Sequence, residues 1–167
     1  LINNPATVAT HHGTYGTEGT TVNTAYLRYG AAGASETTVK NDIGSNYNVT
    51  FKDIFTINQA ALTLYTSGQK VYGVAATTGN LNDITGTGFK NSDADTLALA
   101  ANQTNLKGYV ANAKAAANGN HVGSYGTQGT DGSSTTVLAY DDTDKKNISN
   151  LFNNDYTITY TDKFEIT

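Results

Sequence analysis

The chain has 167 residues, a formal net charge of −4, and charged side chains at only 14% of its positions. Such a weak negative charge provides no electrostatic attraction to nucleic acid or to an anionic membrane. Cysteine is absent, which excludes disulfides and cysteine-ligated metal sites, and no apolar run approaches the roughly 20 residues of a membrane span. The length predicts one domain with a core of its own.

Residues 1–10 predict an extended segment, because small residues dominate and Pro5 disfavours a helix. At a period of two, one face of this segment carries Ile2, Ala6, Val8 and Thr10. Leu1 stands where an initiator methionine would be, so we expect a mature product from which an export signal has been removed.

A loop and two strands are expected next. Closely spaced glycines predict a loop over residues 11–20, and residues 21–29 predict a strand. The clearest strand is 47–57, in which apolar and polar side chains alternate. Asp53 interrupts its apolar face, and Asp162 does so at the matching place of a similar strand near the C-terminus. This interruption predicts a β-bulge at both aspartates.

A helix is expected over the alanine-rich range 92–118. Ser92 and Asp95 are placed as a capping pair, and Gly119 as a stop signal. Gly108 is unfavourable inside a helix, which leaves open a division into two shorter helices. The apolar face at helical spacing consists of Leu99, Leu106, Val110, Ala113 and Ala117.

The remaining segments predict strands. Residues 62–66 and 70–76 are typical of a hairpin that turns at 67–69, and strand patterns return at 137–140 and 156–166. Strands therefore predominate over one helical insert. The expected fold class is mainly β, a jelly-roll-like or Greek-key β-sandwich of residues 11–167 with an extended N-terminal strand.

The sequence also contains an internal repeat. The glycine loop at 11–20 returns at 121–130, and the strand at 47–57 returns at 156–166 in the same order. We infer two copies of one unit, about 10–57 and 120–166, separated by an insert, 58–119. The first copy continues into strand-like sequence at 61–76, whereas the second stops at Thr167. We expect the shorter copy to leave an open sheet edge that accepts a strand from another chain.

No motif indicates catalysis. A nucleophile elbow, a His-Glu-x-x-His pair and a strand-to-helix phosphate loop are all missing, so we expect no enzyme, no catalytic residues, no metal ligands and no cofactor. The three histidines fall in the glycine loops and are assigned to solvated turns. Calcium stays open at Asp141, Asp142 and Asp144, although this run lacks the glycine and the distal glutamate of a 12-residue calcium loop.

Three sequons predict covalently attached N-glycans, at Asn48, Asn102 and Asn147. Asn48 alternates with inward-pointing neighbours in its strand, and Asn102 belongs to the polar side of the expected helix. Asn147 lies in a polar stretch beside two lysines. Each asparagine is therefore expected to be exposed.

The run Asn-Val-Thr-Phe-Lys-Asp-Ile-Phe-Thr-Ile-Asn at 48–58 resembles a strand of the TasA/camelysin family and its archaeal relatives. There, a Phe-x-Asp-x-Phe-x-Ile-x-Asn run is followed by another strand. The Asn- and Thr-rich composition and the N-terminal tail are also similar to archaeal thread filaments and bundling pili. The resemblance implies an extracellular fibre of jelly-roll-like subunits, in which each tail completes the sheet of a neighbour, and in threads the surface is glycosylated.

The expected function is therefore a structural subunit of an extracellular filament, a cell-surface appendage that polymerises head to tail by donor-strand complementation. The donor strand consists of Leu1, Ile2, Ala6, Val8 and Thr10. The acceptor groove is expected beside either copy's strand, with the second copy favoured, and its residues are Tyr47, Val49, Phe51, Phe55, Ile57, Tyr156, Ile158, Tyr160, Phe164 and Ile166.

The tail by itself makes a weak joint, because its hydrogen bonds and apolar burial only about balance the cost of ordering it. Docking between the subunit bodies, or an amide bond from the Leu1 amine to an asparagine of a neighbouring subunit, would strengthen it; such a bond also removes a costly buried charge. Two alternatives stay open. One is a monomeric cell-surface carbohydrate-binding or adhesin module that uses Tyr15 and Tyr125, and the other is a surface-lattice protein.

Overall fold

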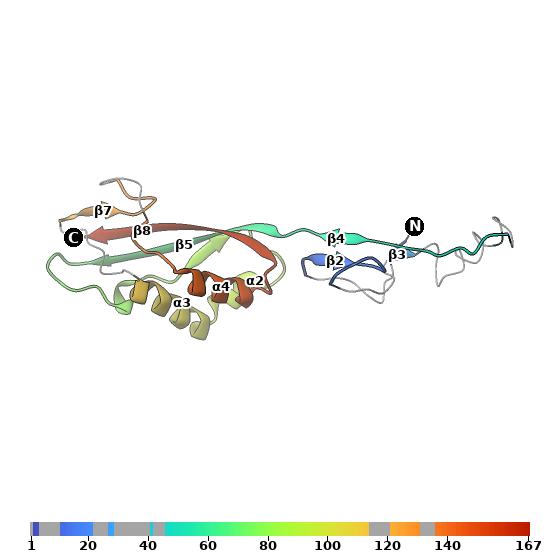
Figure 1. Cartoon of the computed structure of the whole chain (residues 1–167). Helices are drawn as coiled ribbons and strands as arrows, with labels where there is room; N and C mark the ends of the chain where they lie inside the picture. The colour runs from blue at the N-terminus through green and yellow to red at the C-terminus, as the bar shows by residue number, and fades with distance from the viewer. Residues whose placement is uncertain are drawn as a thin grey trace. The chain divides into compact units, whose positions relative to one another are not determined.

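The computed structural model divides the chain into two units, Leu1–Gln59 and Ala60–Thr167, shown in Figure 1. It describes residues 2–3, 11–21, 27–28, 41, 46–113, 121–130 and 136–167. The second unit contains most of the described secondary structure.

The second unit is built on a four-stranded sheet with strand order β6-β5-β8-β7. Its centre is a pair of long strands, β5 (Ala60–Lys70) and β8 (Tyr156–Ile166), which run parallel in register along their whole length. Two short strands, β6 (Thr85–Thr87) and β7 (Gly123–Tyr125), pair antiparallel at the two edges.

Helices cover one face of this sheet, as Figure 1 shows. They are a 3-10 turn, η2 (Thr78–Asn80), and three α-helices, α2 (Asp93–Ala98), α3 (Ala100–Ala113) and α4 (Asp142–Leu151). Among the described residues, no helix has the length and apolar content needed to cross a bilayer.

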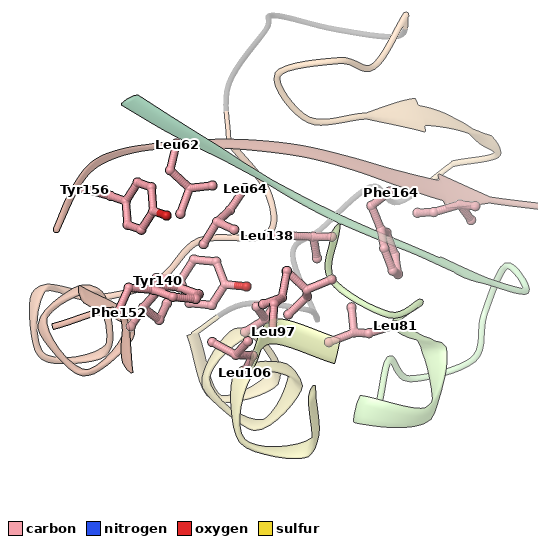
Figure 2. Packing of buried hydrophobic residues seen from close by; sticks show 14 residues of the cluster. Leu62, Leu64, Leu81, Leu97, Leu106, Leu138, Tyr140, Phe152, Tyr156 and Phe164 are labelled. Atoms are coloured by element: carbon pink, nitrogen blue, oxygen red, sulfur yellow. The ribbon is translucent and has the colours of Figure 1, made fainter. Parts of the chain in front are cut away.

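The core lies between the sheet and the helices. Figure 2 shows Leu62, Leu64 and Phe164 directed from the sheet toward the helical layer, where Leu97 and Leu106 meet them. Burying each of these side chains contributes roughly 1.5–3 kcal/mol. The buried cluster consists of Leu62, Leu64, Leu81, Ile84, Leu97, Leu106, Val110, Leu138, Tyr140, Ile148, Phe152, Tyr156, Phe164 and Ile166.

The first unit contains two short antiparallel pairs. In one, β2 (Gly13–Tyr15) pairs with β4 (Phe55–Ile57). In the other, β1 (Ile2–Asn3) pairs with β3 (Leu27–Arg28) of the same chain, with Ile2 opposite Arg28.

The described part of the second unit is an α/β fold, one sheet covered by helices with roughly equal strand and helix content, and it does not show the second sheet of the expected β-sandwich. One reason for this difference is helix α4, which the sequence pattern did not predict. Asp141 is its N-cap, and the Asp141 carboxylate accepts a hydrogen bond from the Asp144 backbone N–H at 2.8 Å. The acidic run weighed as a calcium site is therefore a helix start, from which Ile148 and Phe152 reach the core.

The expected hairpin at 62–76 is also wrong, because β5 runs without interruption through its expected turn at 67–69. Gly68 is needed there for close packing and not for a turn. A Cβ at this position would lie 2.5 Å from the Asn80 carbonyl oxygen and 3.1 Å from the Phe164 ring. A glycine within a strand often marks such an approach of a second backbone.

The helical range divides in two at Leu99, which is exposed and has extended backbone with ψ of 130°. This matches the open alternative of two helices, but the break lies away from Gly108. Ser92 is the N-cap of α2, and its carbonyl oxygen, not its side chain, accepts the hydrogen bond from Asp95 N–H at 3.0 Å. Ala117 and Gly119 lie outside the described residues.

The remaining strand predictions vary in outcome. β8 has the bounds predicted for it, 156–166. Only Phe55–Ile57 of the strand predicted at 47–57 pairs as a strand in the described structure, and of the strand predicted at 137–140, Val137 and Leu138 form a bend and the other two residues are irregular. Of the strand predicted at 21–29, the structure describes Thr21 and the two residues of β3.

Candidate functional site

The two copies of the repeat form the same local structure. In the first copy, Gly13 pairs with Ile57 across β2 and β4. In the second, Gly123 pairs with Ile166 across β7 and β8. The sequence repeat is thus also a repeat of backbone pairing, and the two copies can be compared residue by residue.

Asp162 connects the loop of the second copy to its strand. Its carboxylate is 1% exposed, and Oδ1 accepts hydrogen bonds from the Thr127 N–H at 3.0 Å and the Thr127 hydroxyl at 2.9 Å. Oδ2 accepts from the backbone N–H groups of Val137 and Leu138, both at 2.7 Å. The Gln128 N–H donates to the Asp162 carbonyl oxygen at 3.0 Å. A buried carboxylate is tolerated here because each oxygen has donors.

Asp53 makes the corresponding bonds in the first copy. Its Oδ1 accepts from the Thr17 N–H at 2.8 Å, its own N–H donates to the Thr17 hydroxyl at 2.8 Å, and its carbonyl oxygen accepts from the Glu18 N–H at 3.1 Å. The bulge expected at the aspartates is wrong for Asp162, since the register of β8 with β5 is continuous there, with Thr66 opposite Asp162. Each aspartate binds its loop, and Asp162 does so from within a continuous strand.

The glycine before each threonine is required by the backbone. Gly16 and Gly126 have φ values of 112° and 104°, a region that other residues rarely adopt. A Cβ on Gly126 would lie 2.6 Å from the Asp162 carbonyl oxygen, and one on Gly16 would overlap with that of Asp53. The repeated Tyr-Gly-Thr of the sequence therefore encodes one turn that closes over one aspartate.

The tyrosines of the two loops support the same turn. The Tyr15 hydroxyl donates to the His11 carbonyl oxygen at 2.8 Å, and the Tyr125 hydroxyl donates to that of His121 at 3.0 Å. Tyr15 is buried and Tyr125 is half-buried. The expectation that both rings are exposed for carbohydrate binding is therefore wrong.

The two copies differ sharply in the burial of their strands. Tyr47 is 68% exposed, whereas its counterpart Tyr156 is 4% exposed. Phe55 is 37% exposed, whereas Phe164 is 1% exposed. The second strand is part of a core, and the same pattern in the first copy leaves aromatic surface in water.

The neighbours of each strand explain this difference. β8 lies between β5 and β7, and β5 contributes Leu62 and Leu64 to the core. In the described part of the chain, β4 belongs to a two-stranded sheet with β2, the counterpart of β7. A counterpart of β5, and of the helices above it, is not found among those residues. The first copy thus presents a strand with apolar side chains and without a parallel neighbour in the described structure.

The proposed donor residues are only partly described. Ile2 lies in β1, while Leu1, Ala6, Val8 and Thr10 lie outside the described residues, as does the Leu1 amine. All the proposed acceptor residues of the second copy lie on β8. One edge of β8 is paired with β5 along the full length of the strand. The other edge carries β7 opposite Phe164–Ile166, and no described strand pairs beside Tyr156 to Tyr160.

The three sequons differ in accessibility. Asn48 and Asn147 are exposed, the latter on α4. Asn102 is half-buried, and its side-chain nitrogen, the atom that would carry a glycan, donates to the Thr96 carbonyl oxygen at 2.6 Å. The expectation of an exposed Asn102 is therefore wrong.

Within the described ranges, no three His, Asp or Glu side chains gather as a metal site would require. At the acidic run, burial and the neighbouring Asp141 charge raise the pKa of Asp144, and helix capping accounts for the placement of Asp141.

One signal in the sequence could have located the Val137 and Leu138 contacts with Asp162. Tyr26-Leu27-Arg28-Tyr29 matches Val137-Leu138-Ala139-Tyr140, and this match lies between the two that define the repeat. It would have marked 137–140 as part of the repeated unit.

No protein-family model, no curated protein and no solved structure matches this chain. The resemblance to the TasA/camelysin family therefore depends on the run at 48–58 and on composition. Function has to be inferred from the residues and from the contrast between the two copies.

Proposed function

We propose that the protein is a structural subunit of an extracellular filament, in which a strand from one subunit completes the first copy of the repeat in the next. The observation that carries this proposal is the exposure of Tyr47 and Phe55 where Tyr156 and Phe164 are buried. An exposed strand with apolar side chains is a common acceptor for a strand from another chain. In the second copy the equivalent strand already has a neighbour on each edge, so it serves as the reference for how a completed first copy would be arranged.

In that pattern, the added strand runs parallel to residues 47–57 on the edge opposite β2. This is the place that β5 occupies beside β8, with β7 on the other edge. β5 alternates Leu62 and Leu64 with polar residues, and the predicted donor alternates Ile2, Ala6 and Val8 in the same manner. β5 also precedes the second copy in the chain, just as residues 1–10 precede the first.

Local geometry favours a donor from another subunit. Thr10 is followed by a bend at His11–His12, and β2 begins at Gly13 on the opposite edge of β4. A strand on the edge of β4 opposite β2 would be separated from β2 by two strand spacings, about 9.6 Å. Three residues span roughly 10 Å only when fully extended, which the bend prevents. Before the tail can pair with another subunit, the β1–β3 pairing within its own chain must open. β1 contributes only two residues to this pairing, so few hydrogen bonds are lost.

Glycans fit the same proposal at Asn48 and Asn147, which are exposed. The Asn48 side chain alternates with Tyr47 and Val49 and so faces away from the proposed acceptor surface. We expect glycosylation at these two positions and none at Asn102. Intact-mass measurement of the native protein and of Asn147→Gln checks this, and a glycan found on Asn102 would contradict it.

The direct test is removal of residues 1–10. The truncated protein is expected to fold in its second unit and to remain monomeric, because the donor is missing. Electron microscopy and size-exclusion chromatography report the assembly state. Long fibres from the truncated protein would contradict the proposal.

Cysteine pairs test the acceptor, since the chain has no cysteine of its own. Val8→Cys combined with Val49→Cys or Phe51→Cys, whose side chains share the face of Tyr47, is expected to give disulfide-linked ladders on oxidation. Val8→Cys combined with Ile158→Cys, at the position equivalent to Val49 and already beside β5, is the matched control and is expected to give few. Intramolecular disulfides alone would show that the tail completes its own subunit.

A further inference from the structure

The sheet of the second unit has a groove on the face opposite the helices. Leu62, Leu64 and Thr66 are buried on the core side of β5, so Thr63 and Tyr65, which alternate with them, face away from the core. With Thr161 they form the floor of a cavity of about 310 Å³. Thr85 and Thr87 of β6 border it, and Gln128 of the glycine loop lines it as well. The volume lies at the lower end of the range for small-molecule sites.

The first copy has charged residues at two positions equivalent to ones that line this groove. Glu18 and Lys52 are the counterparts of Gln128 and Thr161, and they form an ion pair, with Lys52 Nζ 2.5 Å from the Glu18 carboxylate. The second copy has two uncharged residues at the same two places, and there the groove is found. At these two positions the first copy has a charged surface contact, whereas the second copy has two uncharged residues that line the groove.

The groove is held by fixed parts of the fold. Gln128 is anchored through its N–H on the Asp162 carbonyl oxygen at 3.0 Å, and Thr127 binds the Asp162 carboxylate. At the β6 edge, a Cβ on Gly86 would lie 2.9 Å from the Phe89 ring and 3.0 Å from the Leu64 side chain, so glycine allows β6 to pack closely there. Thr85 and Thr87, on either side of Gly86, line the groove. A preformed site of this kind loses little entropy on binding.

Its chemistry selects the ligand class. None of the described residues that line it is charged, and on the same face of β8 the nearest charge, Lys163, is paired with Glu165 at 2.6 Å. Threonine hydroxyls and the Gln128 amide both donate and accept hydrogen bonds, and Tyr65 adds an aromatic surface. A ligand that fits should be neutral and rich in hydroxyls, with an apolar side. A peptide strand would instead use the backbone groups of a sheet edge, whereas this groove lies on a sheet face.

We propose that this groove binds a neutral saccharide, about one or two sugar rings in length as its small volume allows. The Tyr65 ring lies against a sugar ring, and the threonine hydroxyls with Gln128 bind the sugar hydroxyls. This site is separate from the strand acceptor of the first unit, so it does not depend on filament formation.

The test uses the full chain and two-dimensional NMR with cellobiose, mannobiose and chitobiose as neutral probes. A weak site has a dissociation constant of about 1 mM, so each probe is added to about 10 mM. At least one is expected to shift the amide signals of Thr63, Tyr65, Thr161 and Gln128. A disaccharide that contains glucuronic acid is expected to bind at least about tenfold more weakly, because burying its carboxylate without a partner is costly.

The decisive variant transfers the ion pair of the first copy into the second, as Gln128→Glu with Thr161→Lys. It is expected to close the groove and lower the association constant at least about tenfold while the thermal midpoint stays near that of the parent. Tyr65→Ala should weaken binding similarly and serves as a second variant if the first does not fold. Thr157→Val, exposed on β8 outside the groove, is the matched control and should bind as the parent does.

Three results would overturn the proposal. The first is the absence of shifts with every neutral probe, and the second is shifts that lie outside the groove. The third is unchanged binding in the folded ion-pair variant. Equal or tighter binding of the acidic probe would overturn the assigned ligand class. Each readout reports on residues of the second unit, whereas the filament test changes residues 1–10, so the two proposals can fail separately.

Discussion

The first and second copies of the repeat carry the same loop and strand but differ in what surrounds them. Asp53 and Asp162 bind their loops with nearly equal hydrogen bonds, so the local structure needs no core. Tyr47 and Tyr156 differ in exposure because only the second strand has β5 and the helical layer beside it in the described structure. A repeat thus fixes local geometry, and burial depends on the elements that cover it.

Core truncation should separate the copies most strongly. Phe164→Ala removes a fully buried ring and is expected to cost about 3–5 kcal/mol of unfolding free energy. Phe55→Ala removes a ring already partly in water, so about 1 kcal/mol is expected for the monomer. Denaturant unfolding of both variants checks this. Equal losses would mean that Phe55 is as well packed as Phe164.

Removal of the loop-binding carboxylate should have the next largest effect. Asp162→Ala leaves the buried N–H groups of Val137 and Leu138 without an acceptor, and a loss of about 3 kcal/mol is expected. Asp53→Ala, at a half-buried position where water can replace the carboxylate, should cost about 1 kcal/mol. Urea unfolding, followed by amide exchange at Thr127 and Thr17, distinguishes the two. A larger loss for Asp53→Ala would contradict the comparison.

The turn glycines should behave alike in both copies. Gly16→Ala and Gly126→Ala each place a Cβ against an aspartate carbonyl in a left-handed conformation, and about 1–3 kcal/mol is expected for each. Gly108→Ala, where a Cβ meets open space in α3, is the matched control and should stabilise by up to about 1 kcal/mol. Thermal unfolding measures all three. Neutral effects at Gly16 and Gly126 would show that the turn can relax.

The smallest effect concerns alkaline pH and the core of the second unit. Burial raises the pKa of Tyr160 to about 12 and also raises the pKa of Tyr140, while an unfolded tyrosine titrates near pH 10. The unfolded chain therefore releases these protons first. Stability from the neutral phenols is complete below about pH 10 and is lost as pH rises through about 12. Tyr160→Phe should flatten this loss in thermal midpoints measured against pH, and an unchanged slope would contradict the assignment.

Repeated residues allowed much of the candidate site to be predicted. The likeness of the two glycine-rich segments and the bounds of β8 follow from alternation and from one glycine pattern used twice. The short strands Gly13–Tyr15 and Gly123–Tyr125 inside the predicted loops did not follow, and only Phe55–Ile57 of the strand predicted at 47–57 is paired. The role of the two aspartates did not follow, because an aspartate on an apolar face is typical of a bulge as well as of a loop anchor. Only the distances from Asp162 to Thr127 and Leu138 distinguish these cases.

The sequence by itself determined the repeat, the absence of cysteine and the alternation of β8, since these depend on residue identity and spacing alone. Tertiary structure decided that β5 continues through Gly68, that Asp141 starts a helix, and that one copy is buried while its equivalent is exposed. These outcomes depend on contacts between residues far apart in the chain. A local sequence pattern does not determine these outcomes, because the same strand sequence can be exposed to water or buried beneath a neighbouring element.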